Sequence, residues 1–187
     1  MKTQVWAHRG ASAYAPENTL EAFRLAAEMG ADGVELDVQL SRDGELVVAH
    51  DETIDRVSSG TGYIKDYTLA QLKKLSFNRL FPKFKDARIP TLKEVYELLK
   101  PAGLTVNVEL KTGIILYPEI EEKVLALTAS MGMEDRVIYS SFCHPSLVRL
   151  KELDSGLKTG LLYSDGWIGA ADYGRHTVGA DALHPAL

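Results

Sequence analysis

Acidic and basic side chains interrupt two apolar runs of this sequence. Glu35 and Asp37 stand in one run, and Glu109 and Lys111 stand in the other. Residues two apart point to the same face of a strand, so the members of each pair face the same way. An unpaired charge inside a protein is costly, which indicates that these groups meet a partner. Three carboxylates without thiolates favour a hard divalent cation, Mg²⁺ or Ca²⁺, over Zn²⁺.

Two histidines with charged neighbours end further short runs. His8 precedes Arg9, and His50 precedes Asp51. A cation together with Arg9 and Lys111 would neutralise the oxygens of a phosphoryl group. One imidazole would take a proton from the nucleophile, and the other would protonate the leaving alkoxide. The residue types therefore indicate phosphoryl transfer, and the alternative is a buried network in which the two basic side chains neutralise the carboxylates without a metal.

Other polar and aromatic residues are weaker candidates. His184 ends the last expected strand, and Trp167 lies in a Gly-rich loop, so either could contact the substrate or support the site. Cys143 is expected to be an ordinary rim or core residue. His144 is expected to contact solvent or to cap a helix. The segment 60–62 is too short, and lacks the lysine, for a nucleotide-binding loop.

Short β-rich runs alternate with longer amphipathic runs along the chain. Asn18 is expected to cap the first helix, with Glu21 completing a capping box and Gly30 ending it. Strands are expected near residues 5–8, 31–40, 104–110, 136–142, 158–163 and 180–184, and further helices near 92–100, 118–131 and 144–153. This alternation predicts a parallel sheet covered by helices, whose chemistry gathers at the C-terminal ends of the strands.

One segment breaks the alternation. Only residues 41–45 separate the strand-like runs 34–40 and 46–50. A parallel neighbour needs a crossover of about a dozen residues or more, so these runs must pair antiparallel. The returning run would bring His50 back to Asp37. The excursion continues to about residue 90, and its part 65–88 carries seven Lys or Arg against two Asp. It is either a satellite cluster with a solvated basic face or a cationic cap that attracts an anionic substrate or a lipid surface.

Six strands are fewer than the eight of a closed (β/α)8 barrel, which typically takes about 250 residues. The chain has 187. We expect one α/β domain over residues 1–187, a TIM barrel truncated after its sixth strand, with residues 51–90 inserted as a small cap. An open barrel leaves sheet edges exposed, and a homo-oligomer would cover them.

Composition narrows the classes of partner. The 26 acidic and 21 basic residues leave a formal net charge of −5, which disfavours a general nucleic-acid binder. The single cysteine cannot form an internal disulfide. No apolar run reaches the length of a signal peptide core or of a membrane helix. A cytoplasmic protein with a small-molecule substrate is expected.

Seven short motifs occur in order between residues 6 and 185. They are His8-Arg9-Gly10, Pro16-Glu17-Asn18-Thr19, Glu35-Leu36-Asp37-Val38, Val48-Ala49-His50-Asp51, Val108-Glu109-Leu110-Lys111, Ser140-Ser141-Phe142 and Leu183-His184-Pro185. Together they resemble the glycerophosphodiester phosphodiesterases. That family cleaves deacylated phospholipids into glycerol 3-phosphate and an alcohol.

The resemblance implies a TIM barrel with an insertion after the His-Asp motif. It implies a divalent metal held by Glu35, Asp37 and Glu109, with His8 and His50 as the acid–base pair. By similarity to related phosphodiesterases, His8 is expected to be the base and His50 the acid. Two alternatives stay open: a lysophospholipase D-like activity at a membrane surface, and an inactive fragment that binds only phosphate or metal.

Overall fold

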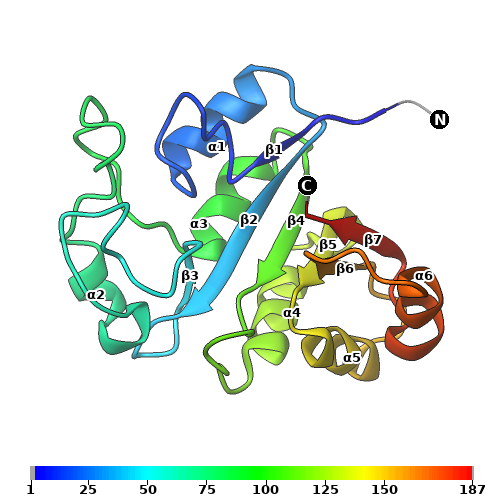
Figure 1. Cartoon of the computed structure of the whole chain (residues 1–187). Helices are drawn as coiled ribbons and strands as arrows, with labels where there is room; N and C mark the ends of the chain where they lie inside the picture. Colours follow the sequence, from blue (N-terminus) through cyan, green and yellow to red (C-terminus); the bar gives the residue numbers. More distant parts are fainter. Residues whose placement is uncertain (1–2, 187) are drawn as a thin grey trace.

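A curled parallel sheet forms the frame of the molecule (Figure 1). The computed structural model describes residues 3–186. The strands run in the order β1-β2-β4-β5-β6-β7, and each pairs in parallel with its neighbour. Their bounds are β1 (Trp6–His8), β2 (Gly33–Leu40), β4 (Thr105–Leu110), β5 (Val137–Ser141), β6 (Thr159–Tyr163) and β7 (Ala182–Pro185). The predicted α/β class is confirmed, and the six expected strands form a half-barrel.

The two faces of the sheet differ in chemistry, as β2 demonstrates. Val34, Leu36 and Val38 are fully buried in the main apolar core. Glu35 and Asp37 alternate with them and therefore lie on the opposite face. We call the side of the core the outer face and the side of the carboxylates the inner face. This alternation places charge and apolar packing on opposite sides of one strand.

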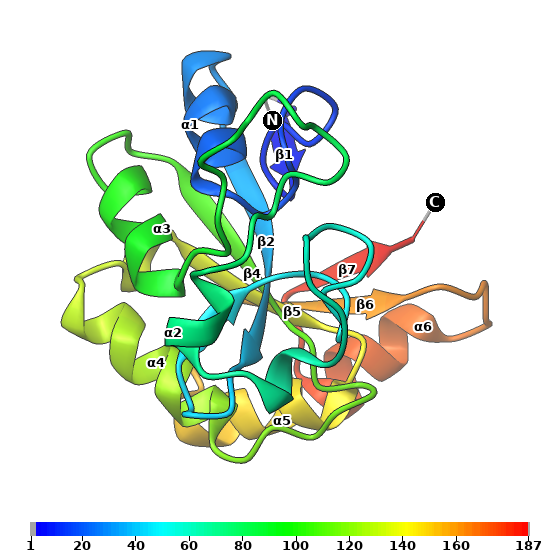
Figure 2. The ribbon, with the colours of Figure 1, turned by 90° about the vertical axis from the view of Figure 1, so that its left-hand side faces the viewer.

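Four helices cover the outer face (Figure 2). They are α1 (Leu20–Glu28), α3 (Leu92–Leu99), α4 (Ile120–Ser130) and α5 (His144–Leu153), and the short helix η2 (Glu134–Arg136) leads into β5. Thr91 and Glu94 form a capping box that begins α3. None of the helices in residues 3–186 is long and apolar enough to cross a membrane.

The predicted antiparallel return is confirmed. Strand β3 (Leu46–Val48) pairs antiparallel with β2, and Leu40 lies opposite Leu46. Gly44 has a φ of 78° at the turn, a conformation that glycine adopts without strain. Beyond β3, the Ala49 amide donates to the Asp37 carbonyl at 3.0 Å. The hairpin therefore brings the chain at His50 back to the end of β2.

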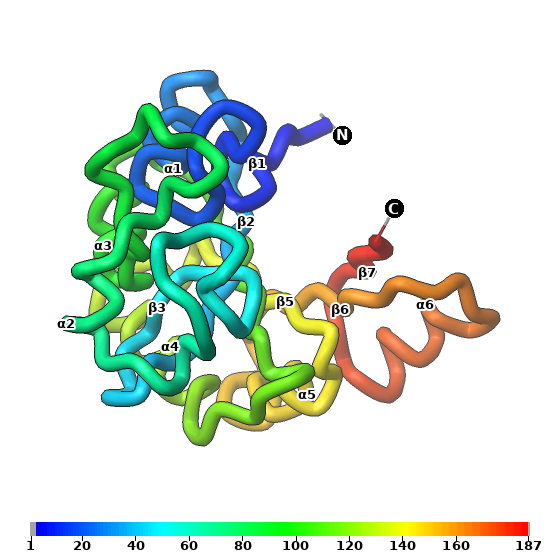
Figure 3. The backbone as a smooth tube through the Cα atoms, turned by 60° about the vertical axis from the view of Figure 1, so that its left-hand side comes forward, coloured from blue at the N-terminus to red at the C-terminus, as the bar shows by residue number. Residues whose placement is uncertain are grey.

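Residues 51–90 pack around an apolar cluster of their own, beside β2 and β3 (Figure 3). They contain the short helices η1 (Ile64–Asp66) and α2 (Leu69–Leu72). Ile54, Ile64, Leu72 and Phe77 form this cluster with residues of β3 and its flanks. The segment therefore contains an apolar satellite cluster, as one of the two interpretations of the sequence predicted.

The predicted start of the first helix is wrong by one residue. Thr19, not Asn18, is the N-cap, and its side chain accepts from the Ala22 amide. Asn18 has a φ of 56°, so its backbone is left-handed. Its side chain turns to the inner face and bonds to Asp37. Asn18 is therefore part of the site and not part of a capping box with Glu21.

The sequence also missed a helical segment between β6 and β7. Residues 170–178 form α6 (Ala170–Asp172) and the π-helix η3 (Tyr173–Val178). The expected role of His144 as a cap or solvent contact is wrong as well. Cys143 is the N-cap of α5, while the His144 ring lies 3.1 Å from the Tyr173 hydroxyl and 2.9 Å from the Leu162 carbonyl. His144 ties the missed helix to β6.

Candidate active site

Three carboxylates converge on the inner face. Asp37 on β2 lies in register with Glu109 on β4, and Glu35 precedes Asp37 by two residues. One oxygen from each of the three lies within 4.8 Å of the others. Asp37 is fully buried and Glu109 is nearly so. The acidic cluster expected from the sequence is therefore formed by two adjacent parallel strands.

The electrostatics of this cluster are unfavourable without a further positive charge. Burial, followed by the charges of Asp37 and Glu109, raises the pKa of Glu35 well above its usual range. Burial and Asp37 likewise raise the pKa of Glu109. Within residues 3–186, Glu35 Oε1 and Asp37 Oδ1 are buried with no hydrogen-bond partner. Buried carboxylate oxygens that lack a hydrogen bond fit a divalent cation of the hard, oxygen-binding kind.

Two basic side chains border the acidic cluster. Lys111 Nζ lies 2.9 Å from Glu109 Oε1 and 3.8 Å from Asp37 Oδ1. Arg9 Nε lies 3.6 Å from Asp37 Oδ2. Burial alone would lower the pKa of Lys111, but the Glu109 and Asp37 charges raise it. Two cations do not balance three carboxylates, so the purely ion-paired interpretation leaves one negative charge uncompensated when all three are ionised.

His8 ends β1 at the border of the cluster. Its Nε2 lies 3.7 Å from Glu35 Oε2, and its side chain is 68% exposed. Partial desolvation and then the neighbouring Arg9 charge lower the pKa of His8. A lowered pKa favours the neutral imidazole, and a neutral imidazole can accept a proton.

His50 follows the returning strand β3, and its ring is oriented by the next residue. His50 Nδ1 lies 2.7 Å from Asp51 Oδ1. Burial would raise the pKa of Asp51, but Arg56 and His50 lower it to about 2. An ionised carboxylate can only accept, so Nδ1 carries the proton of this bond. The Asp51 carboxylate thereby orients the His50 ring through Nδ1.

The Gln39 side chain anchors the main chain around His50 through hydrogen bonds. This fully buried side chain donates from Nε2 to the carbonyls of Ala49, His50 and Asp51, at 2.9, 3.2 and 2.8 Å. The Tyr117 hydroxyl donates to Gln39 Oε1 at 2.9 Å. Sequence reasoning missed Gln39, although its place two residues after Asp37 puts it on the inner face.

A network of charged side chains connects His50 to the first loop. Arg56 bonds to both oxygens of Asp51 and to both oxygens of Glu17. Glu17 also accepts from Arg9 Nη1 at 3.1 Å. Sequence reasoning missed Arg56. The sequence does contain an arginine shortly after the His-Asp motif, and Glu17 is the acidic residue of the Pro16-Glu17-Asn18-Thr19 motif.

Two more polar residues lie beside the carboxylates on neighbouring strands of the inner face. Asn107 lies in register with Glu35, and Ser140 lies in register with Glu109. Asn107 Oδ1 and Ser140 Oγ are buried and have no hydrogen-bond partner in the described part of the chain. The inner face therefore keeps unused polar atoms across three strands.

The two weaker candidates lie further along the chain, His184 on β7 and Trp167 in the loop between β6 and α6. The His184 ring packs over Gly160, where a Cβ would collide with it, and burial lowers the pKa of His184. Trp167 contacts Tyr163 and Tyr173, with ring centroids 6.5 and 5.1 Å apart. Tyr163 is two residues from Leu161 in the outer core, so this aromatic group lies toward the helix-covered side. Substrate contact by His184 or Trp167 stays a prediction.

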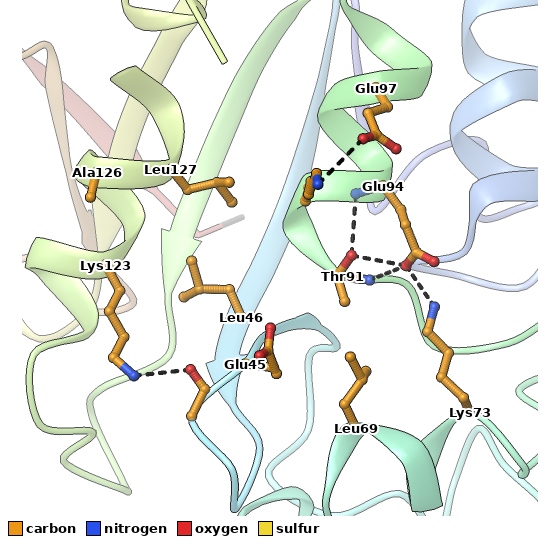
Figure 4. A pocket seen from close by; sticks show the side chains of 12 residues that line it. Glu45, Leu46, Leu69, Lys73, Thr91, Glu94, Glu97, Lys123, Ala126 and Leu127 are labelled. Atoms are coloured by element: carbon orange, nitrogen blue, oxygen red, sulfur yellow. Dashed lines mark hydrogen bonds and ion pairs between the residues drawn. The ribbon is translucent and has the colours of Figure 1, made fainter. Parts of the chain in front are cut away.

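The groove in Figure 4 lies elsewhere, between α3, α4 and the β3 hairpin. Its volume is about 620 Å³. Several of its charged side chains are paired: Lys73 binds Glu94 at 2.6 Å, Lys93 lies 3.9 Å from Glu97, and Lys123 donates to the Gly44 carbonyl at 3.0 Å (Figure 4). No predicted site residue lines it. This groove is therefore separate from the predicted site residues.

Comparison with known proteins shows which family this sequence resembles. The model of the glycerophosphoryl diester phosphodiesterase family matches residues 8–186. A glycerophosphodiester phosphodiesterase of Caldanaerobacter subterraneus is 53% identical over 169 residues, which cover 90% of this chain and 70% of the relative. A glycerophosphodiester phosphodiesterase of Bacillus altitudinis is 42% identical over 187 residues, which cover 99% of this chain and 76% of the relative.

Solved structures match the fold as well. An Oleispira antarctica phosphodiesterase in complex with the product sn-glycerol-3-phosphate superposes with a TM-score of 0.85 at 33% identity, over 98% of this chain and 74% of that one. A Thermotoga maritima glycerophosphodiester phosphodiesterase superposes with a TM-score of 0.78 at 34% identity, over 99% and 74%. The chain belongs to the glycerophosphoryl diester phosphodiesterase family.

Proposed function

We propose that this chain hydrolyses glycerophosphodiesters to sn-glycerol 3-phosphate and an alcohol, with one Mg²⁺ or Ca²⁺ as cofactor. The observation that carries the proposal is the buried acidic cluster, with its unpaired oxygens, bordered by histidines from two other segments. The product bound to the Oleispira antarctica relative supports the same substrate class.

In this proposal Glu35, Asp37 and Glu109 hold the metal. A bound divalent cation would offset the charge on the phosphoryl oxygens and so favour attack at phosphorus. Arg9 and Lys111 bind the phosphate group. Arg9 Nε is buried without a hydrogen-bond partner among the described residues, which fits a donor kept for an anionic ligand.

The two histidines move the protons. His8 accepts a proton from the attacking water as the new P–O bond forms. The bond from phosphorus to the alcohol oxygen breaks, and that oxygen takes a proton from Nε2 of protonated His50. Asp51 stabilises the positive charge of His50 through Nδ1. In a variant of this route, a hydroxyl of the substrate attacks first, and water then opens the cyclic phosphate.

Residues 51–90 act as a cap in this proposal. They follow His50 directly, and their Arg56 reaches Asp51 and Glu17 at the border of the site. A lysophospholipid is a second candidate substrate, because Ile114, Leu116 and Ile168 are exposed in the loops that follow β4 and β6. Exposed apolar side chains at such loops suit an acyl chain or a lipid surface.

The test is release of glycerol 3-phosphate from glycerophosphocholine by the purified chain, read with a coupled dehydrogenase. We expect release with Mg²⁺ or Ca²⁺, loss with EDTA, and recovery on adding metal back. Lysophosphatidylcholine assayed in parallel, with and without anionic vesicles, separates the two substrate candidates. Metal binding by calorimetry without any release would instead identify a chain that only binds the ion.

A further inference from the structure

Arg56 is the meeting point of two carboxylates from distant parts of the chain. Its Nε and Nη2 donate to Asp51 at 2.7 and 3.1 Å. Its Nη1 and Nη2 donate to Glu17 at 2.7 and 2.7 Å. The guanidinium of Arg56 therefore donates along two of its edges, and each edge donates to both oxygens of one carboxylate.

Only arginine has the shape for this task. The guanidinium is planar and offers five donors in a fixed fork, whereas lysine is a point charge on a flexible stem. Bidentate pairs fix orientation as well as distance. Arg56 therefore holds the planes of both carboxylates, and not merely their charges.

Each carboxylate in turn holds a residue of the site. Asp51 accepts from His50 Nδ1, and Glu17 accepts from Arg9 Nη1. The Arg56 charge also lowers the pKa of both Asp51 and Glu17, so both remain acceptors at neutral pH. Arg56 reaches the proposed acid and the proposed phosphate ligand through one intermediate residue each.

The backbone that carries Arg56 is itself fixed. Ile54 is fully buried in the cluster of residues 51–90, its amide donates to the Gly62 carbonyl at 3.0 Å, and its carbonyl accepts from the Ser58 amide at 3.0 Å. Arg79 Nη1 donates to the Asp55 carbonyl at 2.6 Å. The guanidinium thus extends from a packed segment toward the site.

We propose that Arg56 is a positioning residue: through Asp51 it fixes the tautomer and orientation of His50, and through Glu17 it fixes Arg9. The proposal rests on the proposed function for its effect on turnover. The predicted effect of Arg56 on the His50 ring is independent of the proposed function, because it is measurable in the chain without substrate. Arg56 thereby contributes to catalysis through Asp51 and Glu17.

The experiment compares Arg56→Ala and Arg56→Lys with Arg149→Ala. Arg149 is the matched control, because it also pairs with two glutamates, Glu122 at 2.6 Å and Glu152 at 3.4 Å, on the helical side of the molecule. Nitrogen-15 NMR of the histidine rings reports which nitrogen of His50 carries the proton, and loss of a signal in His50→Gln assigns it. Steady-state kinetics on glycerophosphocholine report kcat and KM separately.

We expect Arg56→Ala to shift His50 from a single Nδ1-protonated form toward a tautomer mixture. We expect kcat to fall about ten- to a hundredfold, as for a misplaced catalytic group, with partial recovery when guanidinium is added below its denaturing range. Arg56→Lys should behave like Arg56→Ala, and Arg149→Ala like the parent chain. A purely structural role would lower the melting temperature without moving the tautomer or responding to guanidinium.

A folded Arg56 variant with the parent tautomer of His50, or with the parent kcat, would overturn the proposal. If Arg56→Ala does not fold, Arg56→Lys, which keeps the charge but not the fork, decides the question by the same NMR readout. If the parent chain shows no turnover, the proposed function fails, whereas the tautomer shift still tests the role of Arg56.

Discussion

Asn18 Nδ2 donates a hydrogen bond of 2.8 Å to Asp37 Oδ2, and both residues are buried. This bond gives Oδ2 of the carboxylate a hydrogen-bond partner, whereas Oδ1 has none among the described residues and lies 3.8 Å from Lys111 Nζ. The turn before α1 thus orients a proposed metal ligand on β2. A residue whose type suggests a helix cap serves the site instead.

Two substitutions at Asn18 separate its backbone role from its side-chain role. Asn18→Gly keeps the left-handed backbone and loses the bond to Asp37, which should cost about 1–3 kcal/mol of unfolding free energy. Asn18→Ala should cost about 1–2 kcal/mol more, because a Cβ disfavours a φ of 56°. Urea unfolding measures both. Equal stabilities for the two variants would contradict the backbone argument.

Glu35→Gln should have opposite effects on the metal-free and the metal-bound protein. It removes one of three crowded carboxylates, so the metal-free chain should melt at a higher temperature. It also removes a proposed ligand, so added Mg²⁺ or Ca²⁺ should no longer stabilise the fold. For the parent chain, metal at a hundredfold excess over its Kd should add about 2.7 kcal/mol.

Thermal melts with and without metal measure both effects. Glu134→Gln is a control that removes a carboxylate from η2, away from the cluster. A metal-dependent rise in melting temperature that survives in Glu35→Gln would exclude Glu35 as a ligand.

The Asp51–Arg56 pair predicts an acid-sensitive contribution to stability. The pKa of Asp51 is lowered to about 2 in the folded chain, below an unfolded value of about 3.9. Its contribution is therefore complete above about pH 4 and is lost as the pH falls toward 2. Its size is at most about 3 kcal/mol, and solvent screening reduces it because the pair is partly exposed.

Urea unfolding of the parent chain and of Asp51→Asn between pH 7 and pH 2 checks this prediction. The difference in unfolding free energy between the parent chain and Asp51→Asn should shrink as the solution becomes more acidic. Asp86→Asn, an exposed carboxylate in the same segment, should give a small difference that does not change with pH. A gap between parent and Asp51→Asn that stays constant to pH 2 would contradict the ionic origin.

Gly160→Ala should destabilise the chain through His184. A Cβ at residue 160 would overlap the His184 ring, and overpacking of this kind costs about 1–3 kcal/mol. Removing the ring in the double variant Gly160→Ala/His184→Ala should restore part of the loss. A double-mutant cycle measures the coupling, and additive effects would show that the two residues do not contact each other.

The sequence predicts best what depends on local periodicity. The alternation in β2 and β4 correctly placed Glu35, Asp37 and Glu109 on one face, because side-chain direction in a strand follows from position alone. The short spacing between β2 and β3 correctly required an antiparallel return. Both inferences depend on geometry that neighbouring residues determine.

What the sequence did not reveal depends on contacts between distant residues. Asn18 has the chemistry of a cap, and only the partner on β2 decides its role. Arg56 meets Glu17 across 39 positions, which no local pattern encodes. The helix at 170–178 includes Gly174 and a π-helical turn, so its helical propensity is weak. Packing and the contact with His144 hold it in place.

The position of Gln39 has a consequence for how this protein can change. Glu35, Asp37 and Gln39 occupy alternate positions of a single strand, so the proposed metal ligands and the anchor of the His50 loop share one register. A slip of one residue would turn all three toward the helices and bring valine and leucine into their place. Mutations that loosen the pairing of this strand would therefore impair reactivity and folding together, and evolution cannot adjust one independently of the other at this point of the chain.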